Sequence, residues 1–398
     1  MPRRRFLKAL AVPGGLLTVS QTLTQACGPA GPASSGGPPA SSGASTKGPI
    51  RLGRLDTFTG PAASSGVAAK LATDLLIDQV RAEGGVIDGR QLEVEYFDGG
   101  GQLAEEINGF KKFGQDPSIV ASVGQGINWA GGQLLADLSN KLKLPHFTGH
   151  HTPSDLSNYP YIVRPSGGTL EAIVNKCTDF VIQQLRAKSI ALLADNQTVP
   201  RDSMSLMKQR LAAAGVTVTS EQYLEVGTTD ASAIITRAKL GSPDVIAGYH
   251  TSGQIPLIFK QVTDLGGWGN AKFFGMTGGA VVGTIPHLAA AQNTFHAAHW
   301  APGLLDVGGQ KFEKAFAAKY GTAPDTSHSG AYIVVGTAIA AVRLAASTDR
   351  DVLAKAMRSG NVTWDAPGGS LTMRPSGENS VLLQVVQIQN GRVVPYWK

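Results

Sequence analysis

The fold of this chain is constrained most by a regular alternation of short β-rich runs with amphipathic helical runs, which begins at residue 50. The first run, residues 50–56 (IRLGRLD), precedes a segment in which Val67, Leu71 and Leu75 recur every fourth residue, the spacing of one helix face. Strands that alternate with helices favour a parallel sheet with helices on both faces. The sequence therefore predicts a doubly wound α/β fold.

The alternation occurs twice, so the 398 residues are expected to form two lobes, each with its own sheet. A C-terminal hairpin is expected around the Asn390-Gly391 turn. The apolar run of residues 331–342 is too short to span a bilayer and is predicted to be a buried helix. Helices are expected over residues 67–80, 104–113, 132–142, 170–186, 203–214, 231–240, 254–265 and 329–346.

The first 27 residues have the pattern of an export signal, with a cationic start, a weakly apolar middle and small residues before Cys27. The string RRRFLKAL matches the twin-arginine pattern, and an ordinary secretory signal is the alternative. The string LTQAC resembles a lipoprotein box, which predicts lipid on Cys27, but Thr24 replaces the usual leucine and would also suit ordinary cleavage. Residues 28–48 are rich in Gly, Pro, Ser and Ala, so we expect a flexible linker.

The net charge gives no reason to expect nucleic-acid binding. Four of the six excess positive charges lie in the first 27 residues, which contain no acid, so 6 − 4 leaves +2 on the remainder. The remaining cysteine, Cys177, lies in an apolar helical run and is predicted to be a core residue without a disulfide partner.

The sequence contains no recognisable catalytic or cofactor motif, since the phosphate loop, the dinucleotide pattern, the nucleophile elbow and the metalloprotease motif are all missing. The string LPHFTGHHTPSD brings together His146, His150 and His151, of which the first two would share one face of a strand. Hydrogen bonding at a pocket rim, plain packing and a metal site are the alternatives, and no cysteine or acid at a companion spacing favours the metal. We therefore expect no enzyme activity, no cofactor and no metal.

Three motifs, GRLDTFTGPAASSG, EGGVIDGRQLEVEYFD and YPYIVRPSGGTLEAIV, resemble the periplasmic branched-chain amino acid binding proteins, the type I solute-binding proteins of ABC importers. The resemblance covers nearly all of residues 50–398. It implies two doubly wound parallel-sheet lobes that are joined by three crossover strands and close on a ligand. The implied divisions are 1–27 (export signal), 28–48 (linker), 49–168 plus 298–368 (lobe 1) and 169–297 plus 369–398 (lobe 2).

The resemblance also indicates which residues face the ligand, at the carboxyl ends of the strands. Residues 57–66, with Ser64 and Ser65, would form a loop that leads into a helix N-terminus, which favours a negative group. The alternative is an ordinary turn in which one of these serines caps the helix. The other implied positions are Asn128, Trp129, His150, His151, Thr152, Val199, Tyr249 (with His250 behind it) and Thr277.

One of these positions departs from the family in charge. Thr277 stands where the family has the acidic residue that grips the ammonium group of an amino acid. A charge-assisted hydrogen bond contributes about 1.5–3 kcal/mol. Either another acid, such as Asp98 or Asp202, takes over, or the ligand is a small organic acid or amide instead of an amino acid.

The resemblance implies an extracytoplasmic, monomeric protein that captures a solute and presents it to an ABC permease and ATPase complex, held at the membrane if Cys27 carries lipid. A ligand-sensing module of the same fold is the alternative from another functional class. A hydrolase that uses the histidine cluster is a further alternative.

Overall fold

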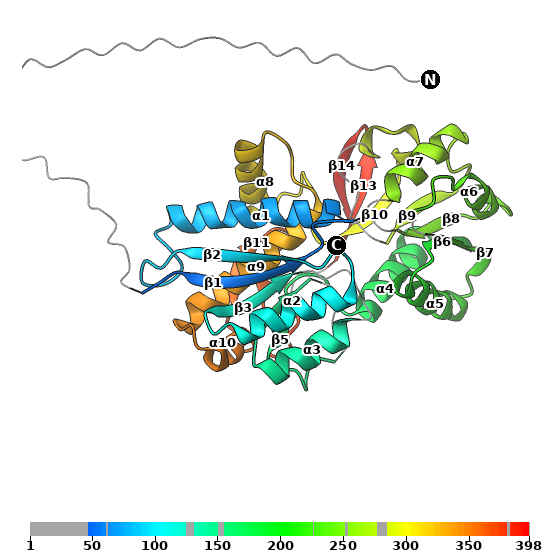
Figure 1. Cartoon of the computed structure of the whole chain (residues 1–398). Coiled ribbons are helices and arrows are strands. Elements are labelled where there is room, and N and C mark those ends of the chain that lie inside the picture. The colour runs from blue at the N-terminus through cyan, green and yellow to red at the C-terminus, as the bar shows by residue number, and fades with distance from the viewer. Residues whose placement is uncertain are drawn as a thin grey trace, which may run out of the picture. The chain divides into compact units, whose positions relative to one another are not determined.

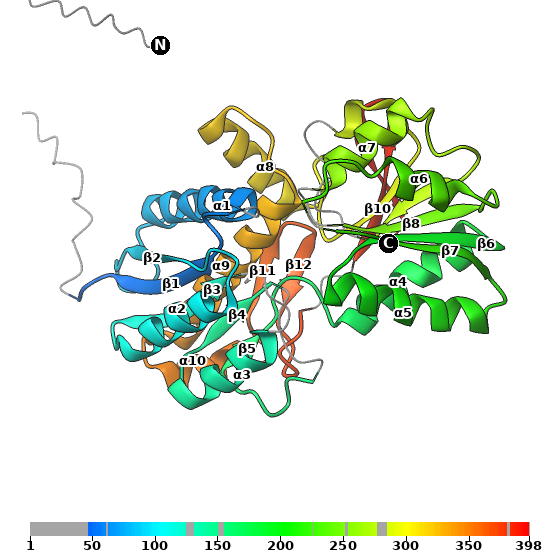
Figure 2. The same cartoon turned by 45° about the vertical axis from the view of Figure 1, so that its right-hand side comes forward.

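Two β-sheets organise the part of the chain that the structure describes. The computed structural model describes residues 47–60, 63–124, 131–149, 155–225, 227–250, 254–276, 285–379 and 383–397. Figures 1 and 2 show helices on both faces of each sheet, with the N-terminal series of elements in one lobe and the green and yellow elements in the other. The predicted doubly wound α/β fold with two lobes is confirmed.

The first sheet is five-stranded and parallel, with the order β2-β1-β3-β4-β5. Its strands are β1 (Ile50–Asp56), β2 (Leu92–Asp98), β3 (Ile119–Gly124), β4 (His146–Thr148) and β5 (Ile162–Val163). Helices α1 (Ala63–Ala82) and α9 (Thr326–Ala345) share one hydrophobic core with one face of the sheet. Helices α2 (Leu103–Gln115) and α3 (Gly131–Leu142) pack on the other face, around Phe110 and Phe113.

The second sheet is seven-stranded, with the order β14-β13-β10-β9-β8-β6-β7. Its parallel strands are β6 (Ser189–Asp195), β7 (Thr217–Leu224), β8 (Val245–Tyr249), β9 (Lys272–Gly275) and β10 (Phe295–Ala298). Strand β13 (Gln384–Gln389) pairs antiparallel with β10 and with β14 (Arg392–Trp397). Its helices are α4 (Leu170–Asp179), α5 (Thr198–Ala213), α6 (Ser232–Lys239) and α7 (Ile255–Asp264). The predicted C-terminal hairpin is confirmed, with Asn390 and Gly391 both at positive φ, as its tight turn requires.

The structure adds elements that the sequence did not reveal and shifts some boundaries. The predicted helix over residues 170–186 is α-helical only to Asp179 and continues as a π-helical turn, Phe180–Gln184. The helix expected from residue 203 begins five residues earlier, at Thr198. The additions are α8 (Val307–Tyr320), α10 (Arg350–Met357), β11 (Thr363–Ala366) and β12 (Gly369–Thr372). Strands β11 and β12 pair with each other across residue 368, and the exact limits of the lobes stay a prediction.

Helix α9 is the buried helix that the sequence predicts. It is long and apolar enough to cross a membrane by length and composition, but 67% of its most apolar window is buried inside the protein. It contacts α1 on one side and β3 and β4 on the other. Its apolar surface is therefore used in the core of the first lobe.

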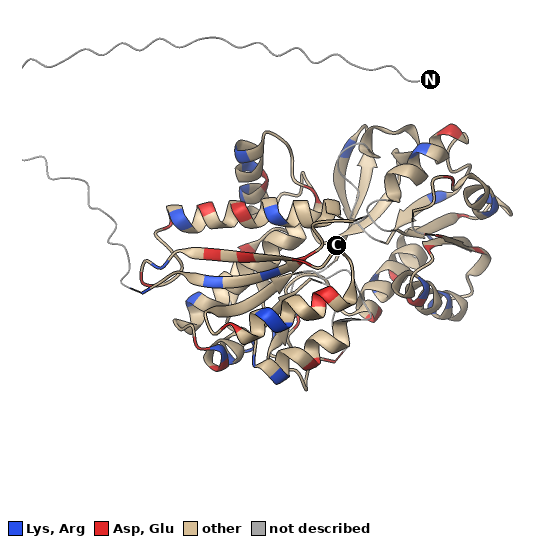
Figure 3. Cartoon of the chain, in the orientation of Figure 1, with Lys and Arg blue, Asp and Glu red and all other residues tan. Residues whose placement is uncertain are grey.

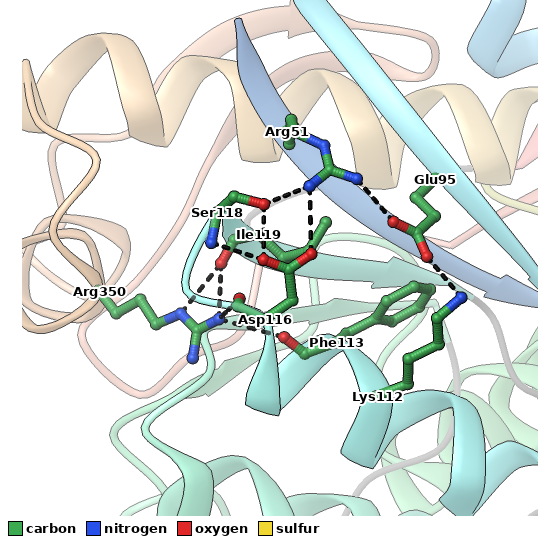
Figure 4. A network of polar contacts seen from close by, with 8 residues as sticks. All are labelled: Arg51, Glu95, Lys112, Phe113, Asp116, Ser118, Ile119 and Arg350. Carbon is green, nitrogen blue, oxygen red and sulfur yellow. Dashed lines mark hydrogen bonds and ion pairs between the residues drawn. The ribbon is translucent and has the colours of Figure 1, made fainter. Parts of the chain in front are cut away.

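A polar network ties the amino-terminal edge of the first sheet together (Figure 4). Arg350, at the start of α10, donates to the carbonyl oxygens of Phe113, Gly114, Asp116 and Ile119. Arg51 pairs with Glu95 at 2.7 Å and with Asp116 at 3.1 Å. These contacts provide hydrogen-bond donors for the carbonyl oxygens of the turn between α2 and β3, so the amino-terminal edge of the sheet has a structural role. The opposite, carboxyl edge is the one where ligands bind in sheets of this type.

The distribution of charge and the burial of Cys177 can be compared with the sequence predictions. Lysine, arginine and acidic positions are interspersed over the view drawn in Figure 3. Cys177 is buried, and burial raises the pKa of its thiol, which makes it an inert core residue.

Two buried histidines link stability to pH. Burial lowers the pKa of His146 to about 4, although a backbone hydrogen bond with Ser122 raises it, and burial lowers the pKa of His296 to about 3. Above pH 6.5 both histidines are neutral in the folded and the unfolded chain, so neither reduces the free energy of unfolding. As pH falls from 6.5 toward 4, the unfolded chain takes up protons that the folded protein excludes, so each histidine costs up to about 1.4 kcal/mol per pH unit.

We predict that His146→Phe, which preserves an aromatic ring against Phe110, reduces the stability lost between pH 7 and pH 5, as measured by urea unfolding at both values. The same change in the exposed His287 is the control and should leave that loss as in the wild type. Equal losses in all three proteins would contradict this account.

Candidate functional site

Both sheets reverse their winding at one point, and this locates the candidate site. In the first lobe, β2 lies on one side of β1 and β3 lies on the other, so the direction of winding reverses at β1. In the second lobe, β6 lies in the same way between β7 and β8. Loops that leave the carboxyl ends of such neighbouring strands diverge and open a crevice. The candidate site therefore lies at the ends of β1 and β3 in one lobe and of β6 and β8 in the other.

In the first lobe, one carboxylate organises the loop after β1. Asp98, at the end of β2, accepts hydrogen bonds from the Phe58 amide (2.8 Å), the Gly100 amide (2.9 Å) and the Thr59 hydroxyl (2.6 Å). Desolvation opposes ionisation, but these donors outweigh it and lower the pKa of Asp98. Asp98 is thus a structural anchor for the loop, which leaves it poorly suited to the role of ligand counterion.

The serines that the sequence singled out lie where this loop becomes helical. Helix α1 begins at Ala63, so Ser64 and Ser65 stand in its first turn, and the alternative that one of them is the N-cap is wrong. Ser64 is exposed and Ser65 half-buried. Gly66 beside them is buried, and a Cβ there would lie 2.0 Å from the carbonyl oxygen of Thr57. The close approach of loop and helix therefore depends on glycine.

A buried ion pair lies beneath this loop. Arg54 and Asp56 point to the same face of β1, and Arg54 Nη2 is 2.7 Å from Asp56 Oδ2. Arg54 also donates to the Thr73 hydroxyl on α1 at 3.0 Å. Burial raises the pKa of Asp56 despite the opposing effect of Arg54. Through the Arg54–Thr73 hydrogen bond, the pair connects the end of strand β1 to helix α1.

In the second lobe, a carboxylate and an imidazole meet at the point of reversal. Asp195 ends β6, and His250 directly follows β8, which is its neighbour in the sheet. His250 Nδ1 lies 2.7 Å from Asp195 Oδ1, and the two side chains are 3% and 0% exposed. A carboxylate on Nδ1 holds the imidazole in one orientation. Sequence reasoning placed His250 near the ligand but missed its partner, although the ends of adjacent parallel strands were the signal available.

The neighbouring predicted residues have different surroundings. Tyr249 is half-buried against the second lobe's core, and burial is the main cause that raises the pKa of its hydroxyl. Val199 lies in the first turn of α5 and is 5% exposed. Both remain predicted contacts.

The histidine cluster is divided. His146 is buried and packs edge-on against Phe110, with ring centroids 5.1 Å apart, so the expectation that it shares a functional face with His150 gives way to a core role. Over the described ranges, no group of three metal-ligating side chains occurs. Several predicted positions lie outside the described residues: Cys27, Asn128, Trp129, His150, His151, Thr152 and Thr277.

Comparison with known proteins gives a consistent result. The family model of periplasmic binding proteins matches residues 49–392. A Leu/Ile/Val-binding protein of Rhizobium johnstonii is 25% identical over 248 residues, which cover 59% of this chain and 66% of that protein. The chain thus spans slightly less than two thirds of that relative, and the same share of a Leu/Ile/Val-binding protein homolog of Brucella melitensis.

Two solved structures share the fold at 19% identity. The solute-binding protein of an ABC transporter from Rhodopseudomonas palustris, in complex with 3,4-dihydroxybenzoic acid, aligns with a TM-score of 0.74 over 88% of this chain and 96% of its own. The branched-chain amino acid transporter substrate-binding protein of Streptococcus pneumoniae, in complex with isoleucine, aligns with a TM-score of 0.73 over 87% of this chain and 97% of its own. The same architecture thus holds an aromatic acid in one protein and an amino acid in the other.

We predict that Gly66→Ala destabilises the protein by about 1–3 kcal/mol or more, because the new methyl group meets backbone atoms that cannot rotate away. Thermal and urea unfolding would measure the loss. The matched control is Gly48→Ala, where a Cβ has nothing within 4 Å and should change stability little. A Gly66→Ala protein as stable as this control would contradict the predicted close approach.

Proposed function

Because the chain belongs to the periplasmic binding protein family, we propose that it is the extracytoplasmic solute-binding protein of an ABC importer and captures an amino acid or a related small organic acid or amide by closure of its lobes. Proteins of this family and fold bind substrates and are not enzymes. The observation that carries the proposal is the repeated winding reversal, which gives each lobe one set of diverging strand-end loops.

The segments between the lobes support closure by a hinge. The chain passes from the first sheet to the second after β5, leaves the second sheet after β10 for α8 to β12, and returns to it at β13. Such connections can absorb a rotation while each sheet stays rigid. Closure is favoured only as far as the ligand binds the closed form better than the open form.

Two of these segments are fastened to each other. Arg164, which follows β5, pairs with Glu378 at 2.7 Å, and the Arg164 side chain is 1% exposed. The Arg164 amide donates to the Gly377 carbonyl at 2.7 Å, and the Asn379 amide group donates to the Gly167 carbonyl at 2.8 Å. We infer that the first and third segments move as one unit.

The test of this function is direct. Titration of the purified protein with a panel of amino acids, organic acids and amides should reveal one class that binds and raises the melting temperature, since a ligand at a hundred times its Kd stabilises by about 2.7 kcal/mol. Small-angle scattering should report a smaller radius of gyration on binding. The proposal would be overturned if no compound in the panel binds and native mass spectrometry detects no co-purified solute.

Export and anchoring are separate proposals that rest on the N-terminal sequence. We expect the twin-arginine pattern to direct export and Cys27 to carry lipid, so that the linker of residues 28–48 tethers the protein near its permease. Changing Arg3 and Arg4 to lysine should block export, and Cys27→Ala should release the exported protein from membranes. Retention of the Cys27→Ala protein in the membrane fraction would contradict lipid anchoring.

A further inference from the structure

The acidic residues at the strand ends restrict what the candidate site can bind. Among the described residues, four acids end or directly follow parallel strands: Asp56 ends β1, Asp98 ends β2, Asp195 ends β6 and Glu225 follows β7. An ammonium group in a closed site needs one of them as its partner, because an unpaired buried charge is strongly unfavourable. The question is whether any of them is available.

All four are engaged by the protein itself. Asp56 forms the buried pair with Arg54, and Asp98 is held by the backbone and hydroxyl donors of the first loop. Glu225 follows the edge strand β7 and accepts a hydrogen bond from the side-chain amide of Asn196. Asp195 ends β6, at the winding reversal of the second lobe, and it pairs with His250.

The segments that the structure leaves undescribed after residue 60 contain no further acid. They are residues 61–62, 125–130, 150–154, 226, 251–253, 277–284, 380–382 and 398, and none of them is Asp or Glu. These segments therefore add no acidic side chain that could serve as the partner of an ammonium group.

The Asp195–His250 pair is the decisive contact. For an ammonium group to reach the Asp195 carboxylate, it would have to displace an imidazole whose side chain is 3% exposed. Breaking a buried pair costs about 3–5 kcal/mol, more than the 1.5–3 kcal/mol that a charge-assisted hydrogen bond returns. A carboxylate ligand does not require this displacement, since it needs no protein acid as its partner and accepts hydrogen bonds from N–H and O–H donors.

We propose, on the premise that the proposed function holds, that the solute is a carboxylate without an α-ammonium group, and that the Asp195–His250 pair sets this preference by keeping Asp195 from acting as a counterion. The pair is a specificity determinant in this sense. His250 occupies the Asp195 carboxylate, and that carboxylate orients the His250 imidazole.

The experiment compares ligands that differ only in the ammonium group. Calorimetric titration of the secreted protein would use leucine against 4-methylpentanoate, phenylalanine against 3-phenylpropanoate, and the amide of each acid. The acid of at least one pair should bind at least tenfold more tightly than its amino acid and its amide. Tighter binding of the amino acid or of the amide would overturn the inference and leave the proposed function standing.

Variants test the role of the pair. His250→Asn frees the Asp195 carboxylate and should shift the acid-to-amino-acid preference at least tenfold toward the amino acid, whereas the double variant Asp195→Asn/His250→Asn, which lacks the carboxylate, should not gain amino acid affinity. Asp264→Asn, which removes an exposed carboxylate from the carboxyl end of α7, is the matched control and should keep the wild-type preference.

The outcomes are distinguishable. A preference in His250→Asn that equals the wild-type preference would overturn the role of the pair, and the wild-type panel decides the ligand class without any variant. A protein that binds no member of the panel and carries no co-purified solute would count against the proposed function itself. Co-purified solute gives an independent reading, because an amine in it contradicts the inference and an amine-free acid supports it.

Discussion

Parallel pairing of the strands is the constraint on which the rest of this structure depends. A parallel strand must be followed by a crossover before the next strand can pair, and most of the crossovers here contain helices, which cover both faces of each sheet. All strand carboxyl ends then meet at one edge. Because the order is the same in both lobes, β2-β1-β3-β4-β5 and β7-β6-β8-β9-β10, the winding reverses at an equivalent place in each.

The buried charges are arranged around this constraint. Arg54–Asp56 lies at the end of β1, Asp195–His250 at the ends of β6 and β8, and Arg164–Glu378 in the segments between the lobes. A buried pair adds little net stability because desolvation offsets most of its Coulomb energy. It does fix the direction of the groups that form it. These pairs therefore stand where a binding protein needs defined geometry more than it needs additional stability.

Much of the fold could be predicted because its signals are local. The fourfold spacing of apolar residues identified α1, and the Asn390-Gly391 turn identified the β13–β14 hairpin. Helix α8 escaped prediction because it begins Val307-Gly308-Gly309, a poor helix start by propensity. The structure gives the reason for this glycine pair: a Cβ on Gly308 would lie 2.3 Å from the Ala366 carbonyl oxygen of β11. Tertiary packing required what local propensity disfavours.

The candidate site was predictable only in outline, for a related reason. The rule that ligands bind at strand ends indicates which loops to consider, but it cannot say which side chains pair with each other. Asp98 was a candidate counterion in the sequence, and its loop amides turn it into an anchor. Asp195 and His250 are 55 residues apart, and their contact depends on the register of β6 with β8.

The two lobes consequently differ in what they present at equivalent places. The first lobe has the buried Arg54–Asp56 pair at the end of β1, and the loop that follows is held by Asp98 and by the close approach of Gly66. The second lobe places the Asp195–His250 side-chain pair, a carboxylate and an imidazole, at the corresponding strand ends. Substitutions of Asp195 or His250 would change the side chains at these strand ends without disturbing the winding, since neither side chain takes part in the backbone pairing of the sheet.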